Sequence, residues 1–158
     1  LFSGTIDSNI RYGKPEITDA QVKEAAEVAQ ATEFIDTKPE KYKSPVSQGG
    51  TNVSGGQKQR LSIARAIAKD PEIFIFDDSF SALDFKTDSQ LRKALKEYTK
   101  DATTVIVAQR ISTILGADQI IVLDDGHMAG IGTHKELMAN CEVYQQIARS
   151  QLSEEELA

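Results

Sequence analysis

The chain has 158 residues, of which 40% are apolar and 27% are charged. A chain of this size and balance folds as one soluble domain or as part of one, which excludes collagen, small disulfide-rich scaffolds and wholesale disorder. The net charge of −6 has the wrong sign for a protein that binds nucleic acid by neutralising its phosphates, so no nucleic acid partner is expected.

The cysteine content and the apolar runs exclude further classes. Cys141 is the single cysteine, so we expect neither an intrachain disulfide nor a cysteine-based metal cluster, and we expect a reducing compartment. The longest apolar runs, at 73–76 and 120–123, fall far short of the roughly 20 residues that span a bilayer. Because the chain begins at Leu1 and shows no signal peptide, we expect it to be a piece of a longer protein.

The first part of the chain is expected to be mostly helical with long connections. Thr18 and Gln21 have the spacing of a helix capping box, in which each side chain bonds the other residue's backbone N–H. A helix is therefore predicted over residues 19–31, followed by a proline-interrupted stretch and a loop at 47–52. Its apolar face comprises Val22, Ala25, Ala26 and Ala29.

A second helix is predicted over residues 54–69. Ser54 and Gln57 repeat the capping-box spacing, and Asp70 with Pro71 ends the run. Apolar side chains recur at helical spacing at Leu61, Ala64, Ile67 and Ala68.

Strands and helices alternate after this helix. Short β-branched or aromatic runs predict strands at 73–76, 104–108 and 119–123. A helical pattern from Leu91 to Tyr98 separates the first two runs. This alternation predicts an α/β fold with a parallel sheet, in which the strand at 73–76 is buried.

The C-terminal part begins with a turn at 124–126, and residues 127–132 are expected to form an edge strand. Thr133 and Glu136 form another capping box and open a further helix. The acidic residues 153–156 are expected to fray.

The segment 53–60 carries the strongest chemical signal, because it places a hydroxyl and two glycines at the start of a helix. Free backbone N–H groups and the positive end of the helix dipole suit a phosphate at such a place. The alternative is an ordinary serine-capped helix.

Two carboxylates, Asp77 and Asp78, follow the predicted strand at 73–76. The carboxyl ends of strands are where α/β sheets bind ligands, and a Mg-nucleotide is a natural occupant. The alternative is a solvated turn from strand to loop. Residues 81–84, with the sequence Ser-Ala-Leu-Asp, follow directly.

In this order and spacing, the three segments resemble the signature motif, the Walker B strand and the D-loop of the ABC ATPases. Residues 1–6 and 9–10 resemble the segment after the Q-loop of exporter-type members, and residues 130–137 resemble their C-terminal part. The resemblance implies a fragment of an α/β P-loop NTPase fold. We expect a helical subdomain with the signature motif at 1–70, the C-terminal part of a mainly parallel core sheet at 71–150 and an acidic tail at 151–158.

The resemblance also implies roles for individual residues. Asp77 would hold Mg²⁺, and Asp78 occupies the position of the catalytic carboxylate. The signature residues would bind the ATP held by a second nucleotide-binding domain in a head-to-tail dimer, with Asp84 at the dimer interface. These signature residues are Ser54, Gly55, Gly56 and Gln57.

Two positions depart from the family pattern. Gln109 stands where the family has the switch histidine that contacts the γ-phosphate, and it cannot carry the charge of a protonated histidine. Asp78 stands where the family has Glu, and its shorter reach impairs the orientation of an attacking water. The two histidines, His127 and His134, are interpreted as surface residues. Together these features resemble the slow half-site of a heterodimeric multidrug exporter, and the alternative is an active homodimeric exporter.

No G-x-x-x-x-G-K-[ST] pattern occurs in residues 1–158, so the chain by itself is not expected to hydrolyse ATP. The longer protein would be an ATP-driven exporter with its transmembrane domain upstream. Its ATP-binding domain, of which this chain is a part, would lie on the cytoplasmic face of the membrane. A soluble ABC-type ATPase of DNA repair or chromosome maintenance is a second hypothesis. The negative net charge and the absence of coiled-coil heptad runs argue against it. A non-enzymatic regulatory module is a third, and the transported substrate is not predicted.

Overall fold

The computed structural model describes residues 1–153, so most of the acidic stretch that we expected to fray lies outside the described residues. Contacts divide the chain into one unit at Leu1–Val105 and a second that begins at Ile106. This division does not test the boundary predicted near residue 70, which stays a prediction.

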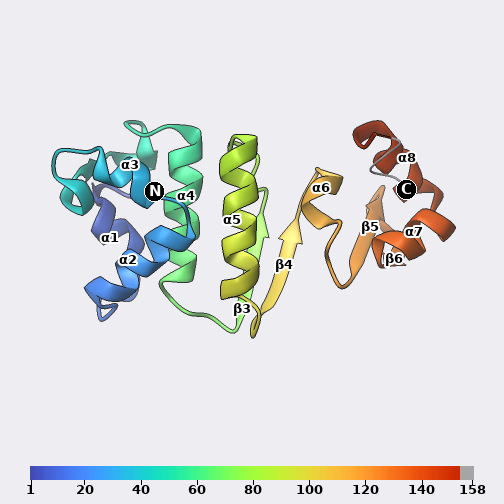
Figure 1. Ribbon diagram of the computed structural model, residues 1–158, viewed down its shortest axis with the longest axis horizontal. Coiled ribbons are helices and arrows are strands. Elements are labelled where there is room, and N and C mark those ends of the chain that lie inside the picture. Colours follow the sequence, from blue (N-terminus) through green and yellow to red (C-terminus); the bar gives the residue numbers. More distant parts are fainter. Residues whose placement is uncertain (154–158) are drawn as a thin grey trace. The chain divides into compact units, whose positions relative to one another are not determined.

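The first unit, shown in blue to yellow in Figure 1, consists of helices and short strands, and its last strand extends two residues past Val105. In chain order they are β1 (Gly4–Thr5), α1 (Ile6–Ile10), α2 (Asp19–Val28), α3 (Thr32–Asp36), η1 (Lys41–Lys43), β2 (Pro45–Val46), η2 (Gln48–Gly50), α4 (Gly55–Ile67), β3 (Ile73–Asp77), α5 (Phe85–Tyr98) and β4 (Thr103–Val107). The second unit contributes α6 (Ile111–Ile114), β5 (Ile120–Asp124), β6 (His127–Gly132), α7 (His134–Asn140) and α8 (Glu142–Gln151). No described helix is both long enough and apolar enough to cross a membrane.

The capping boxes predicted for α2, α4 and α7 are all present. At α2 the Thr18 hydroxyl accepts a hydrogen bond from the Gln21 N–H at 3.3 Å, and the Gln21 side chain accepts one from the Thr18 N–H at 2.9 Å. The helix ends at Val28, earlier than expected, because Gln30 takes a left-handed backbone conformation with φ of 55°. A short connection then leads into α3.

The core of the first unit lies around α4, which packs against α1 and α2. The faces that meet there are fully or almost fully buried and consist of Ile6, Ile10, Val22, Ala25, Ala26, Leu61, Ala64 and Ile67. Burial of a large aliphatic side chain stabilises a fold by about 1.5–3 kcal/mol, so these contacts fix α4 in place. The start of α4, where the signature residues lie, is thereby held by the core.

The strands β3 and β4 are hydrogen-bonded neighbours, joined through α5. Phe74 is buried beside Tyr98 of α5, with an edge-on ring contact at 6.5 Å, whereas Ile75 is 70% exposed. The prediction of a fully buried strand is therefore wrong for one face, because successive side chains of a strand point to opposite faces and the described residues cover only one of them.

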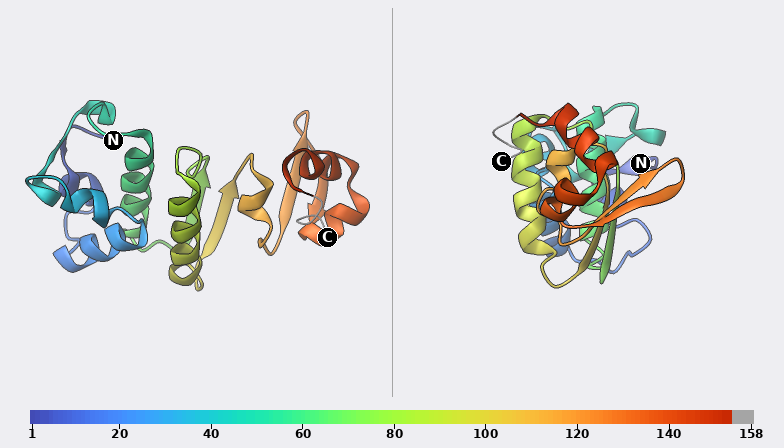
Figure 2. Two further views of the ribbon diagram at one scale, coloured as in Figure 1. Left: turned by 45° about the horizontal axis from the view of Figure 1, so that its top comes forward. Right: turned by 90° about the vertical axis from the view of Figure 1, so that its right-hand side faces the viewer.

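In the second unit, β5 and β6 form an antiparallel hairpin that confirms the predicted turn and strand. Asp125 and Gly126 have φ of 46° and 78°, the left-handed pair that a tight hairpin turn requires. Such a turn enforces antiparallel pairing, and β1 with β2 is antiparallel too. The mixture of helices and short strands agrees with the predicted α/β class. Figure 2 shows α7 and α8 beside the hairpin, with which they make contact.

Candidate functional site

Ser54 is the N-cap of α4 and takes part in a reciprocal pair of hydrogen bonds with Gln57. Its hydroxyl accepts from the Gln57 N–H at 3.2 Å, and the Gln57 side chain accepts from the Ser54 N–H at 3.2 Å. Gly55 and Gly56 occupy the first turn, where backbone N–H groups have no partner within the helix. The start of α4 therefore presents two N–H groups and the positive end of a helix of 13 residues.

Asp77 ends β3, and Asp78 turns the chain away from the strand. The backbone of Asp78 is left-handed, with φ of 45°, and its carboxylate oxygen Oδ2 accepts a hydrogen bond from the Ser81 hydroxyl at 3.1 Å. Aspartate tolerates a left-handed backbone better than glutamate does. The backbone conformation therefore gives a physical reason for an aspartate, with its shorter carboxylate, at this position.

Asp84 is the N-cap of α5, a role that the sequence analysis did not assign. Its Oδ1 accepts a hydrogen bond from the Thr87 N–H at 3.0 Å, and its Oδ2 accepts one from the Thr87 hydroxyl at 2.7 Å. These bonds, first the one from the backbone N–H, lower the pKa of Asp84 below its ordinary value. The carboxylate is exposed and remains ionised at neutral pH.

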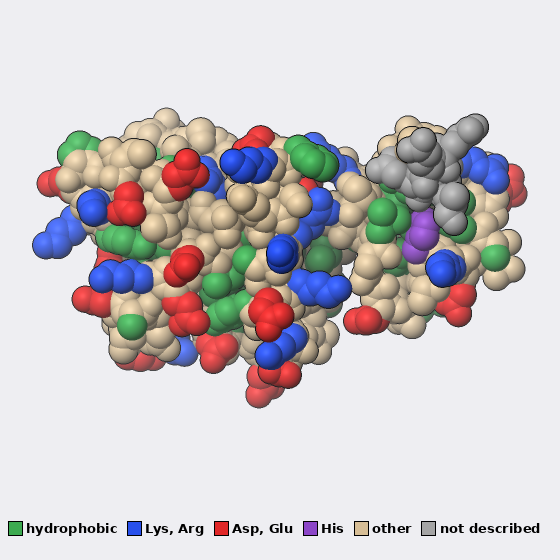
Figure 3. All heavy atoms as spheres, viewed as in Figure 1, with side chains coloured by type: hydrophobic (Ala, Val, Ile, Leu, Met, Phe, Trp, Pro, Cys, Tyr) green, Lys and Arg blue, Asp and Glu red, His purple; other side chains and the backbone are tan. Residues whose placement is uncertain are grey.

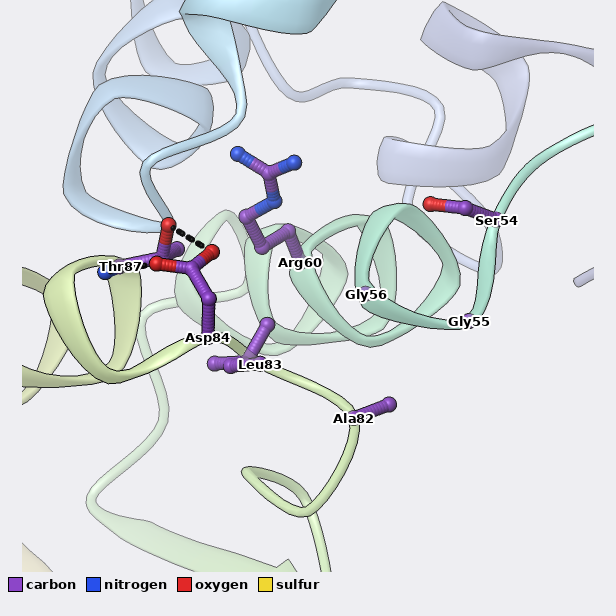
Figure 4. Close-up of a pocket in the computed structure, with 8 residues that line it drawn as sticks. All are labelled: Ser54, Gly55, Gly56, Arg60, Ala82, Leu83, Asp84 and Thr87. Carbon is purple, nitrogen blue, oxygen red and sulfur yellow. Dashed lines mark hydrogen bonds between the residues drawn. The ribbon is translucent and has the colours of Figure 1, made fainter.

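A hollow of about 480 Å³ is lined by residues from the start of α4 and from the segment before α5 (Figure 4). It brings three of the predicted signature residues together with Asp84, whereas Gln57, Asp77 and Asp78 do not line it. Added to Gly56, a Cβ would lie 3.1 Å from the backbone oxygen of Ala82, so the two segments approach each other closely. The lining residues are Ser54, Gly55, Gly56, Arg60, Ala82, Leu83, Asp84 and Thr87.

Arg60 is the cationic residue of this hollow, and the sequence analysis gave it no role. Its guanidinium donates a hydrogen bond to the backbone oxygen of Gln30 at 2.7 Å and lies 4.8 Å from the ring centre of Phe34. Burial lowers the pKa of Arg60, which the charges of Asp84 and Glu33 raise in part. The side chain still carries its positive charge at neutral pH and adds to the attraction of the hollow for an anion.

Gln109 belongs to the second unit, just before α6. Its backbone oxygen accepts a hydrogen bond from the side chain of Gln151 at 2.9 Å, and Gln151 Oε1 accepts one from the Ile111 N–H at 2.8 Å. The side chain of Gln109 is exposed. The predicted switch position is thus tied to the end of α8 by Gln151, which the sequence analysis missed because the two residues lie far apart in the chain.

The two histidines differ from each other. His127 is exposed, as expected, but His134 is half-buried, and its Nδ1 lies 2.8 Å from the hydroxyl of the buried Tyr144. The interpretation of His134 as a surface residue is therefore wrong. It opens α7, and the hydrogen bond to Tyr144 draws its ring against α8.

The donor chemistry of Asp77 and Asp78 fits Mg²⁺ when a nucleotide supplies further ligands, because Mg²⁺ in nucleotide sites is held by one or two carboxylates together with phosphate oxygens and water. Within residues 1–153 there is no cluster of three or more His, Cys, Asp or Glu that could hold a metal ion without such help.

Comparison with known proteins places these features in a family. The model of the ABC transporter family matches residues 3–81, half of the chain, and this stretch contains α4, β3 and most of the segment between β3 and α5. The chain belongs to the ABC transporter family.

Known ABC transporter proteins resemble the chain over almost its whole length. An uncharacterised ABC transporter ATP-binding protein of Mycobacterium bovis is 47% identical over 96% of this chain and 26% of its own length. A putative multidrug export ATP-binding/permease protein of Staphylococcus aureus is 47% identical over 93% of this chain and 25% of its own length. The structure of a bacterial Atm1-family ABC exporter with ATP bound superposes with a TM-score of 0.93 at 38% identity, over 98% of this chain and 27% of that one.

These similarities confirm the predicted family and the ABC ATPase fold of the chain, with its mixture of helices and sheet. The chain spans about a quarter of the length of the relatives that it matches.

Proposed function

We propose that this chain is part of the ATP-binding domain of an ABC exporter, which couples the binding and hydrolysis of ATP to transport across a membrane. Its transmembrane domain would precede the chain, and the ATP-binding domain would lie on the cytoplasmic face. The observation that carries the proposal is the hollow between the start of α4 and the segment before α5. It combines N–H groups at a helix start, the cation of Arg60 and the exposed carboxylate of Asp84. A phosphate brought by a second nucleotide-binding domain is a suitable occupant.

In this proposal, the chain takes part in two ATP sites. The signature residues complete the site whose nucleotide is held by the partner domain, and Asp84 lies at the interface with that partner. Asp77, Asp78 and Gln109 belong to the second site, where Asp77 would hold the Mg²⁺ that neutralises phosphate charge. The signature residues are Ser54, Gly55, Gly56 and Gln57.

We propose further that the second site hydrolyses ATP slowly. The carboxylate of Asp78 is one methylene shorter than that of Glu, and a misplacement of about 1 Å at a reacting water can cost about a hundredfold in rate. Gln109 can donate a neutral hydrogen bond but no positive charge. The two departures together support a heterodimer in which the partner's site, completed by this chain's α4, supplies most of the turnover.

An active homodimeric exporter is the second candidate, and the left-handed backbone of Asp78 favours it. If Asp is present because the turn requires it, the carboxylate need not indicate a slow site. A DNA-binding ATPase has no comparable support, because acidic and basic side chains are interspersed over the face in Figure 3 and the net charge is −6.

The test is a gain of activity in the full-length exporter assembled with its natural partner. Asp78→Glu combined with Gln109→His restores both family residues, and we expect it to raise steady-state ATP turnover, because the second site then contributes. The matched control is Gln90→His, which introduces the same side chain at an exposed position on α5. Unchanged turnover in the double variant, with ATP binding retained, would contradict a slow site limited by these two residues.

A further inference from the structure

Gln59 lies on α4, one turn after Gly55, and its side chain makes three hydrogen bonds to the segment that follows β3. Its Oε1 accepts from the Ala82 N–H at 2.9 Å, and its Nε2 donates to the Asp78 backbone oxygen at 3.1 Å and to Ser81 Oγ at 3.1 Å. Every polar atom of this amide therefore faces the segment 78–82. The pattern fixes the amide orientation, because an exchange of its oxygen and nitrogen would set two donors against each other at Ala82.

Ser81 extends the connection to the carboxylate of Asp78. The hydroxyl of Ser81 accepts from Gln59 at 3.1 Å and donates to Asp78 Oδ2 at 3.1 Å, and it lies 3.2 Å from the Asp78 backbone oxygen. Gln59 thus holds both the backbone of the turn and, through one hydroxyl, the side chain that leaves it. A left-handed residue such as Asp78 persists where its surroundings fix it, and Gln59 supplies that constraint.

The glycines of α4 bring the same segment within reach of Gln59. A Cβ on Gly56 would lie 3.1 Å from the Ala82 backbone oxygen, and one on Gly55 would lie 3.4 Å from the Ala82 Cβ. The segment therefore rests directly on the first turn of α4, without intervening side chains. The segment continues through Leu83 to Asp84, which line the hollow opposite the start of α4. The hydrogen bonds of Gln59 therefore attach these two sides of the hollow to each other.

We propose that Gln59 is a positioning residue that clamps the segment 78–84 to α4 and so sets the spacing between the signature residues and Asp84. A nucleotide captured at the start of α4 then moves this segment, and Asp78 with it, as one piece. The clamp connects the two ATP sites in which the chain takes part. This inference rests on the function proposed above, because it assigns a role within the same hollow.

The test compares kinetic constants of the full-length exporter with its partner. Gln59→Met keeps the length of the side chain and removes all three hydrogen bonds, so we expect kcat to fall by about tenfold or more, since small errors of position are costly. The KM for Mg-ATP should stay within about twofold of wild type, because Gln59 does not line the hollow. Gln90→Met makes the same change at an exposed position of α5 and should leave both constants unchanged.

Gln59→Glu supplies the conservative variant. It keeps an acceptor for the Ala82 N–H but loses the donor to the Asp78 oxygen, so we expect a kcat between those of Gln59→Met and wild type. If Gln59→Met does not accumulate as a folded protein, the kcat of Gln59→Glu carries the test. Wild-type kcat in either folded Gln59 variant would overturn the clamp.

Ser54→Arg separates a failure of the clamp from a failure of the proposed function, because it places a bulky cation at the start of α4 itself. If Ser54→Arg abolishes turnover while Gln59→Met does not lower kcat, the clamp alone is refuted. If neither variant lowers turnover, the hollow does not serve ATP hydrolysis, and both the proposed function and the clamp fail.

Discussion

Gly55 and Gly56 differ in the space that each leaves for a side chain. Alanine at Gly55 would make an ordinary contact of 3.4 Å with the Ala82 side chain, whereas alanine at Gly56 would meet the Ala82 backbone oxygen at 3.1 Å. In a helix, alanine is favoured over glycine by up to about 1 kcal/mol, but overpacking against a fixed backbone costs about 1–3 kcal/mol.

We therefore expect Gly55→Ala to leave the free energy of unfolding unchanged or slightly raised, and Gly56→Ala to lower it by about 1 kcal/mol. Urea unfolding followed by circular dichroism measures the difference between the two matched variants. Equal stability of both would show that the Ala82 carbonyl can move away, which would also weaken the clamp by Gln59.

The pKa of Asp84 is lowered by the hydrogen bonds from Thr87, and this predicts a pH dependence with a defined sign. A carboxylate with a lowered folded-state pKa contributes stability that is fully present above its unfolded pKa of about 3.9 and is lost as pH falls through the folded pKa. Asp84→Asn keeps an N-cap but does not titrate.

Wild type should therefore be the more stable of the two at pH 6, and the difference in melting temperature should vanish as pH falls well below 4. Melting curves of both proteins between pH 2 and pH 6 measure this. A difference that stays constant over the whole range would show that ionisation of Asp84 contributes nothing to the cap.

At the scale of single elements, the predictions that were confirmed depended on local chemistry. Thr18 with Gln21, Ser54 with Gln57, and Thr133 with Glu136 all lie three residues apart, so the sequence alone contains the complete cap. The box at α1, between Thr5 and Ser8, was missed because its second residue is serine instead of Glu or Gln.

Features that join distant positions could not be predicted in this way. β1 pairs with β2 across some forty residues of chain, as Gly4 lies opposite Val46, and nothing in either two-residue segment indicates the other. The same limit applies to the site. The signature residues and the pair Asp77 and Asp78 were predicted from their motifs, but the three bonds of Gln59 depend on how α4 and β3 are packed.

The cap of α2 gives a prediction at this scale. Thr18→Ala removes the acceptor for the Gln21 N–H and should cost about 1 kcal/mol of unfolding free energy, whereas Thr18→Ser keeps the hydroxyl and should cost much less. Denaturation midpoints of the two variants measure the difference. Equal midpoints would mean that packing of α2 on α4, and not the cap, determines where this helix begins.

At the scale of the whole molecule, the groups in residues 1–158 that we propose to bind nucleotide would form only part of an ATP site. The start of α4 and Arg60 attract an anion, but the sequence contains no loop of the G-x-x-x-x-G-K-[ST] type that encloses phosphates. We expect a polypeptide of these residues to bind Mg-ATP with a dissociation constant above about 1 mM. Titration calorimetry measures this, and micromolar affinity would contradict it.

Steady-state ATPase rates of the full-length exporter with its natural partner distinguish the proposed unequal pair of ATP sites from two equal sites. Ser54→Arg would block the hollow that we propose to serve the competent site, so turnover should fall by at least about tenfold. Asp78→Asn would remove a carboxylate from the proposed slow site, so turnover should stay within about twofold of wild type. If Asp78→Asn abolishes turnover as completely as Ser54→Arg does, Asp78 belongs to an active site and the homodimeric exporter replaces the asymmetric one.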